Sequence, residues 1–167
     1  IREQVNGSAT QSVQAVNEYI NKQVGPIKND VSYFASKYSQ ADFQTNGDWT
    51  IILKELEQYF ETSEGIVSSF IGTVNGDMIQ SPDLGLMNNP DFDPRTRAWY
   101  QNAEANPGQV IVSDPHQSAS TGDWVVTISK TLSDNSGVFA ANLGMDELYA
   151  LISTIKVGQT GYPFLLT

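Results

Sequence analysis

The stretch Trp124-Val125-Val126-Thr127-Ile128-Ser129-Lys130 alternates between two sets of side chains, as expected for a β-strand in a sheet covered on one face. The turn sequence Asp134-Asn135-Ser136-Gly137 follows it and leads into another strand. Upstream, Asn75-Gly76 is a strong signal for a tight hairpin. Short connections of this kind favour antiparallel pairing. The predicted strands are, in chain order, 66–74, 77–80, 109–113, 123–131 and 137–144.

Helical segments lie mostly outside this run of strands. An apolar stripe with spacings of three and four predicts one long helix over residues 1 to about 40. Gly25-Pro26 leaves the register of the stripe unbroken, so we expect a kink there and not an end. A coiled coil is the alternative, but the stripe is poor in Leu and in flanking charge pairs. Further helices are predicted over 48–62 with Asp48 as cap, from Pro94 to about 105 with Asp93 as cap, and from Asp146 onward.

These elements predict an α+β fold in which a long N-terminal helix packs on an antiparallel sheet. The length of 167 residues suits one domain. The chain begins without Met and ends in the strand-like segment Gly161-Tyr162-Pro163-Phe164-Leu165-Leu166-Thr167. We therefore expect it to be one part of a longer protein.

Composition and charge exclude several classes of protein. Nineteen acidic residues against nine basic ones give a net charge of −10, which argues against a nucleic-acid partner. The chain has no cysteine, so disulfides, thiol nucleophiles and Cys-ligated metals are excluded. No apolar run approaches the roughly 20 residues of a membrane span.

Nothing in the sequence indicates catalysis. The single histidine, His116, has no triad or metal partner nearby in sequence and is interpreted as a solvated loop residue. The acids Asp83, Asp91 and Asp93 lack the spacing of a calcium loop. Nucleophile-elbow, phosphate-loop and zinc motifs are missing. The sequence therefore predicts a binding protein with no enzyme activity, no cofactor and no metal.

Two of the three arginines fall in one short segment, Asp91-Phe92-Asp93-Pro94-Arg95-Thr96-Arg97-Ala98-Trp99-Tyr100. A guanidinium is the natural partner of a carboxylate, and the neighbouring aromatics could supply an apolar wall. The alternative is that both arginines simply pair with the aspartates beside them. A geometric objection also stands, because Arg97 and Trp99 would point to opposite sides of a regular helix.

Two aspartates are further candidates. Asp114 and Asp146 each follow a predicted strand, where turn chemistry and N-capping are sufficient explanations. Two carboxylates at strand ends could also converge on an ammonium group. The sequence pattern leaves both alternatives open.

Four segments together resemble the double Cache (PAS-like) ligand-binding domain of bacterial methyl-accepting chemotaxis receptors and some sensor kinases. They are, in order, Asp93-Pro94-Arg95-Thr96-Arg97-Ala98-Trp99-Tyr100, Trp124-Val125-Val126-Thr127-Ile128-Ser129-Lys130, Leu143-Gly144-Met145-Asp146 and Gly158-Gln159-Thr160-Gly161-Tyr162-Pro163-Phe164-Leu165. The resemblance implies helices over 1–62, a PAS-like sensing module over 63–157, and the start of a second module at 158–167.

The resemblance also implies a function. It implies a periplasmic, extracytoplasmic sensor domain of a membrane-anchored receptor that binds a small zwitterion such as an amino acid, signals by a conformational shift, and forms a homodimer through its long helix. The implied roles are Arg97 on the ligand carboxylate, Asp114 and Asp146 on its ammonium, and Trp99 and Phe92 as walls. This sequence departs from the amino-acid-binding pattern at Phe92, where a Tyr is usual, and at Val112, where an aromatic is usual. The alternatives are a sensor for an organic acid or an amine, and a ligand-free dimerisation module.

Overall fold

The computed structural model describes residues 2–44 and 48–146 of the chain. Contacts divide the chain into two units, one of residues 27–144 and the other of residues 1–26 together with 145–167. In the second unit the described residues are the first part of the N-terminal helix and residues 145 and 146. The predicted helix after Asp146 and the predicted start of a second module lie outside the described residues.

The unit of residues 27–144 is built on an antiparallel sheet. Its strands are β1 (Ile66–Thr73), β2 (Met78–Ser81), β3 (Ile111–Val112), β4 (His116–Gln117), β5 (Trp124–Thr131) and β6 (Gly137–Gly144). The strand order is β2-β1-β6-β5-β3, and β4 also pairs with β5. The predicted antiparallel α+β fold is confirmed, with β4 as a strand that the sequence did not indicate.

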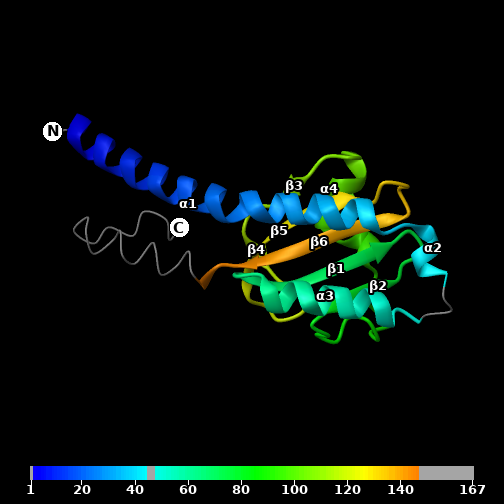
Figure 1. The fold of residues 1–167 in the computed structure, drawn as a ribbon. Coiled ribbons are helices and arrows are strands. Elements are labelled where there is room, and N and C mark those ends of the chain that lie inside the picture. The colour runs from blue at the N-terminus through cyan, green and yellow to red at the C-terminus, as the bar shows by residue number, and fades with distance from the viewer. Residues whose placement is uncertain (1, 45–47, 147–167) are drawn as a thin grey trace. The chain divides into compact units, whose positions relative to one another are not determined.

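Five helical segments accompany the sheet (Figure 1). They are α1 (Arg2–Lys37), α2 (Gln40–Phe43), α3 (Thr50–Thr62), the 3-10 turn η1 (Pro94–Thr96) and α4 (Ala98–Ala105). Helix α1 continues through Pro26, as the unbroken stripe predicted. The short helix α2 was not predicted.

One face of the sheet packs against α1 and α3. The ring of Phe34 on α1 stacks on that of Phe139 on β6, with centroids 5.0 Å apart. Tyr59 on α3 donates a hydrogen bond to Asp30 on α1 at 3.0 Å, which joins the two helices. The apolar stripe of α1 is therefore buried where the structure describes it within this unit, at Ile27, Val31, Phe34 and Tyr38.

The opposite face of the sheet is also covered, which corrects the expectation of a sheet covered on one face only. Strand β5 is buried on both sides from Val125 to Ser129. Segments η1 and α4 lie close over this second face at Gly72, where an added Cβ would fall 2.8 Å from Pro94 and 2.9 Å from Trp99. The polar side chains of β5 therefore face the interior of the molecule and not solvent.

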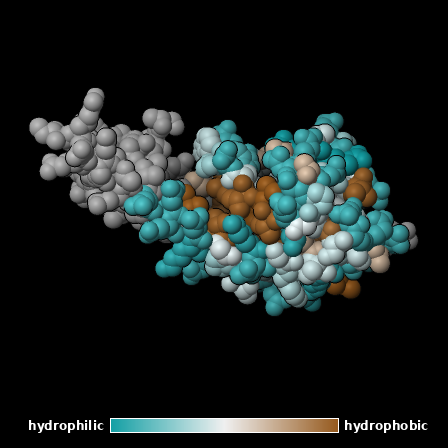
Figure 2. Space-filling model, turned by 90° about the horizontal axis from the view of Figure 1, so that it is seen from above, coloured by the Kyte–Doolittle hydropathy of each residue, from teal (hydrophilic) through white to brown (hydrophobic). Residues whose placement is uncertain are grey.

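The outer surface contrasts with this interior. The face drawn in Figure 2 is largely hydrophilic, with one larger apolar area and a few smaller ones. Among the described residues, no helix combines the length and the apolar character needed to span a bilayer.

Candidate functional site

The segment that carries the two arginines is locally ordered by Asp93. Its carboxylate accepts a hydrogen bond from the backbone N–H of Arg95 at 2.9 Å and caps η1. The Arg95 guanidinium returns to Asp93 at 2.8 Å and also donates to the Val74 carbonyl at 3.1 Å. These hydrogen bonds to Arg95 lower the pKa of Asp93. Arg95 thus stabilises the local fold. For this arginine, the alternative of pairing with a neighbouring aspartate is confirmed.

Arg97 behaves differently, because it stands between η1 and α4 and belongs to neither. Its backbone is extended, with φ −85° and ψ 147°. This conformation removes the geometric objection, since Arg97 and Trp99 are not on one regular helix and both line the same pocket. Among the described residues, the Arg97 side chain makes no hydrogen bond or ion pair.

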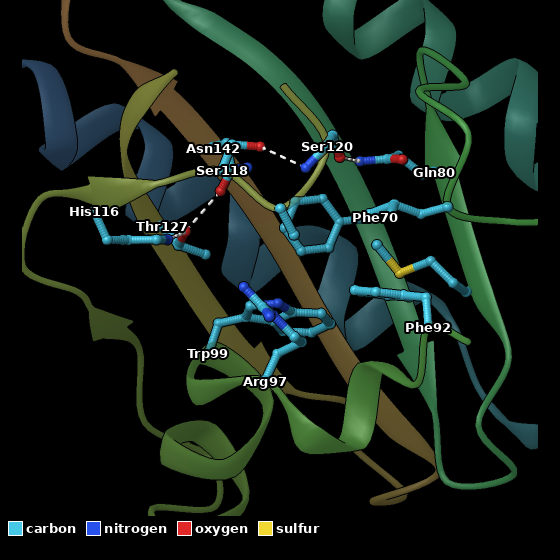
Figure 3. A pocket seen from close by; sticks show the side chains of 13 residues that line it. Phe70, Gln80, Phe92, Arg97, Trp99, His116, Ser118, Ser120, Thr127 and Asn142 are labelled. Carbon is cyan, nitrogen blue, oxygen red and sulfur yellow. Dashed lines mark hydrogen bonds between the residues drawn. The ribbon is translucent and has the colours of Figure 1, made fainter. Parts of the chain in front are cut away.

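This pocket is narrow, with room for roughly one water molecule. It lies against the second face of the sheet, within the unit of residues 27–144 (Figure 3). Its lining residues come from β1, β2, β4, β5, β6, the η1–α4 segment and two loops. They are Phe70, Met78, Gln80, Leu86, Phe92, Arg97, Trp99, His116, Ser118, Ala119, Ser120, Thr127 and Asn142.

One side of the pocket is an apolar wall. The rings of Trp99 and Phe70 meet edge to face with centroids 4.8 Å apart. Phe92 and Trp99 pack against a cluster that contains Phe70, Met78 and Leu86. The predicted wall residues Phe92 and Trp99 are therefore brought together with Arg97.

The loop of residues 118–120 forms another wall and is tied to β2. The Nε2 of Gln80 donates to the Ser120 hydroxyl at 3.2 Å. Gln80 is almost fully buried, and its Oε1 has no hydrogen-bond partner. A buried acceptor without a partner costs free energy, and a donor from a bound molecule would satisfy it.

The remaining wall is a polar network around His116. The Thr127 hydroxyl donates to Asn142 Oδ1 at 2.6 Å and lies 3.2 Å from His116 Nε2. The other ring nitrogen, Nδ1, lies 3.0 Å from the backbone carbonyl of Asp114 and 3.3 Å from the Ser113 hydroxyl. His116 is half-buried on β4 and fixed by these contacts, so its interpretation as a solvated loop residue is wrong.

The two predicted aspartates do not join the pocket as the structure describes it. Asp114 is exposed, and it contributes its carbonyl to His116 while its carboxylate is not part of the lining. Asp146 is exposed and belongs to the other unit. Val112, at the position of a usual aromatic, is 38% exposed and also outside the lining. No carboxylate lines the pocket in the part of the chain that the structure describes.

The sequence reasoning missed Gln80, His116, Thr127 and Asn142. The alternating polar residues of the strand predicted over 123–131 indicate a polar interior only when both faces of the sheet are covered, and the sequence predicted one covered face. The described residues contain no cluster of three or more His, Cys, Asp or Glu able to hold a metal ion.

Comparison with known proteins gives the class of this chain. The methyl-accepting chemotaxis proteins McpA and McpB of Bacillus subtilis (strain 168) are each 32% identical to it, over 164 and 165 residues. These alignments cover 98% and 99% of this chain but 24% and 25% of the relatives. The chain thus spans about a quarter of the length of these relatives. No protein-family model matches it.

Solved structures give the same fold. The ligand-binding domain of the Pseudomonas fluorescens chemoreceptor CtaA, in complex with L-serine, matches with a TM-score of 0.69 and 21% identity, over 91% of this chain and 64% of that one. That of the Pseudomonas aeruginosa PAO1 amino-acid chemoreceptor PctC, in complex with GABA, matches with a TM-score of 0.66 and 25% identity, over 87% and 64%. The fold is that of a chemoreceptor ligand-binding domain of the Cache type. The homologues of this chain are methyl-accepting chemotaxis proteins, as its motifs predicted.

Proposed function

We propose that this chain is the ligand-sensing part of a chemotaxis receptor and that its pocket binds a small carboxylate, such as an amino acid or a close relative. Arg97 binds the carboxylate, and Trp99 and Phe92 enclose the apolar part of the ligand. The homology to chemotaxis receptors and the amino acids bound in structures of the same fold support this assignment. The role of Asp146 in binding a ligand ammonium group stays a prediction from the resemblance.

The observation that carries the proposal is the Arg97 guanidinium at the pocket, which has no hydrogen-bond or ion-pair partner among the described residues. The chain has few cations, and Arg95 two positions away is already paired with Asp93. A charged donor held in a pocket without a protein partner is arranged for an anionic ligand.

A ligand this small needs a large binding free energy per atom in order to bind with micromolar affinity. Micromolar binding corresponds to about −8 kcal/mol. Spread over roughly seven heavy atoms, this approaches the ceiling of about −1.5 kcal/mol per atom for very small ligands. A charge-assisted contact to Arg97 is therefore essential to binding.

The test is a thermal-shift screen of amino acids, organic acids and polyamines, followed by calorimetry on the ligands that stabilise the chain. We expect Arg97→Ala to abolish binding of every such ligand while the fold survives. Arg95→Ala is the matched control, because it removes the same charge from the scaffold and not from the pocket. Equal affinities for wild type and Arg97→Ala would refute the site.

The wider setting is part of the same proposal. We propose that the chain lies on the extracytoplasmic, periplasmic side of a membrane-anchored receptor and dimerises through α1. Its layout would be helices over 1–62, a sensing module over 63–157, and the start of a second module at 158–167. The homology to membrane receptors supports this layout.

A second candidate function is a ligand-free dimerisation module. The narrow free space of the pocket, with room for roughly one water molecule, favours it. In that case no compound in the screen would stabilise the chain, whereas sensor function requires at least one.

A further inference from the structure

Gln80 on β2 is a polar residue beside the apolar wall of the pocket. It lies opposite Phe70 on β1, and directly paired residues of an antiparallel sheet share a face. Gln80 therefore lies on the face of the sheet that carries the pocket, and its side chain is part of the lining (Figure 3). Only 1% of its surface is exposed, although glutamine is mostly a surface residue.

The two polar atoms of this side chain differ in their contacts. Nε2 donates to the Ser120 hydroxyl at 3.2 Å, which holds the side chain against the loop of residues 118–120. Oε1 is buried and has no hydrogen-bond partner. An amide oxygen can only accept, so a donor must reach it inside the pocket. An apolar side chain of the same length would fill this space without an unpaired polar atom, so packing alone does not explain a glutamine here.

The donors of the protein around the pocket do not reach this oxygen. The Thr127 hydroxyl donates to Asn142 Oδ1. The Arg97 guanidinium lines the same pocket from another element, and it has no hydrogen-bond partner among the described residues. The pocket thus contains a charged donor, Arg97, and a buried acceptor, Gln80 Oε1, that are both unpaired in the described part of the chain and do not contact each other.

We propose that Gln80 Oε1 accepts a hydrogen bond from the ligand, so that the pocket selects a small carboxylate that also carries an N–H or O–H group. This inference rests on the proposed function and adds to it a residue that determines specificity. Arg97 binds the carboxylate, and Gln80 receives the ammonium group of an amino acid or the hydroxyl group of a hydroxy acid. An acid without such a group leaves Oε1 unpaired and therefore binds more weakly.

The test compares four acids of three carbons, a size chosen because the free space of the pocket is narrow. Next to the carboxylate, propionate has no polar group, L-lactate a hydroxyl, L-alanine an ammonium group, and pyruvate a carbonyl that only accepts. By calorimetry on the wild-type chain, we expect L-alanine or L-lactate to bind about tenfold more tightly than propionate, and pyruvate no more tightly than propionate. The order of L-alanine and L-lactate identifies the donor as ammonium or hydroxyl. A preference for pyruvate would mean that the amide presents a donor to the ligand, and it overturns the proposal.

The informative variant is Gln80→Met, which keeps an unbranched side chain of similar length and removes both polar atoms. We expect the affinity for the preferred acid to fall about tenfold and that for propionate to change little, so that the preference disappears. Retained propionate binding also shows that the fold and the Arg97 contact are intact. A merely structural role of Gln80 would weaken all four acids together. Either that result or a preference that persists in Gln80→Met overturns the proposal.

The matched variant is Gln80→Glu, which keeps an acceptor at this position and replaces Nε2 by a second oxygen. The Ser120 hydroxyl can donate to that oxygen, so the side chain keeps its attachment to the loop. We expect the preference for the donor-bearing acid over propionate to be retained. Loss of the preference in Gln80→Glu as well as in Gln80→Met would show that the acceptor is not its source.

The outcomes separate the two proposals. If no compound in the broad screen binds, or if binding survives Arg97→Ala, the proposed function fails. If acids bind through Arg97 but neither L-alanine nor L-lactate binds more tightly than propionate, or if none of the four acids binds, only the present inference fails.

Discussion

Arg95 and Arg97 show how backbone conformation assigns different roles to identical side chains. Arg95 lies within η1 and folds back on its own cap, Asp93. Arg97 lies at the junction of two helical segments, where an extended backbone directs it to the pocket. The resemblance singled out Arg97 for the ligand carboxylate. The residue pattern alone could not say which guanidinium was free, because that depends on a junction between helices.

At the same scale, Asp114 provides a test of the ammonium site expected from the resemblance. Its carboxylate is exposed and outside the pocket lining, while its carbonyl faces His116. We expect Asp114→Ala to change ligand affinity by less than about twofold, since backbone contacts survive the substitution. Calorimetry with the ligand found in the screen checks this, with Asp146→Ala titrated in parallel. A large loss in Asp114→Ala would place its carboxylate at the ligand.

The elements that were predicted well are those specified by local chemistry. The Asn75-Gly76 hairpin and the Asp134-to-Gly137 turn lie between paired strands as expected, because turn residues act over a few positions. Strand β4, only two residues long, depends on pairing with β5 and leaves no periodic signal. The polar wall was missed because the side chains that line it with Thr127 and Asn142 come from elements distant in sequence, such as β4 and the loop of residues 118–120.

The close packing of η1 and α4 against the sheet leads to a prediction about these elements. At Gly72 an added methyl group would meet Pro94 and Trp99 at under 3 Å. We expect Gly72→Ala to lower the free energy of unfolding by about 1–3 kcal/mol and to weaken ligand binding, because Trp99 must move. Denaturant unfolding and calorimetry measure the two effects.

The matched control for this change is Gly25→Ala, where an added Cβ meets nothing within 4 Å. Because Gly25 lies within α1, the substitution should be neutral or stabilising. Equal destabilisation by both substitutions would argue against close packing at Gly72.

At the scale of the whole molecule, Asp134 joins segments that are 94 residues apart in sequence. Its carboxylate accepts from the Ser136 hydroxyl at 2.6 Å and from the Gln40 backbone N–H at 2.8 Å. The hydrogen bond from Ser136, followed by that from Gln40, lowers the pKa of Asp134. The turn between β5 and β6 is thereby attached to the start of α2.

This contact predicts a pH-dependent contribution to stability. A carboxyl whose pKa is lower in the folded chain stabilises it above the unfolded value of about 3.9, and the contribution is lost as the pH falls through the folded pKa. We expect Asp134→Ala to cost about 1 kcal/mol near neutral pH, since the group is exposed. The difference from wild type should shrink on acidification.

Thermal unfolding across this pH range checks the prediction. Asp91→Ala is the control, because Asp91 is an exposed aspartate for whose carboxylate the structure records no hydrogen bond. A pH-independent difference between wild type and Asp134→Ala would mean that the carboxylate is not the source of the effect.

The position of β6 limits how ligand binding can change the structure elsewhere in the unit of residues 27–144. One of its faces presents Asn142 to the pocket, and the other presents Phe139 to the ring of Phe34 on α1. A strand cannot slide by one residue without exchanging its two faces, and β6 is held by pairing with both β1 and β5. A displacement of Asn142 by a ligand can therefore reach Phe34 only if β6 tilts or shifts by less than an ångström together with its paired strands. The sheet would move as a rigid body between ligand and helix and would transmit the displacement with all its inter-strand hydrogen bonds intact.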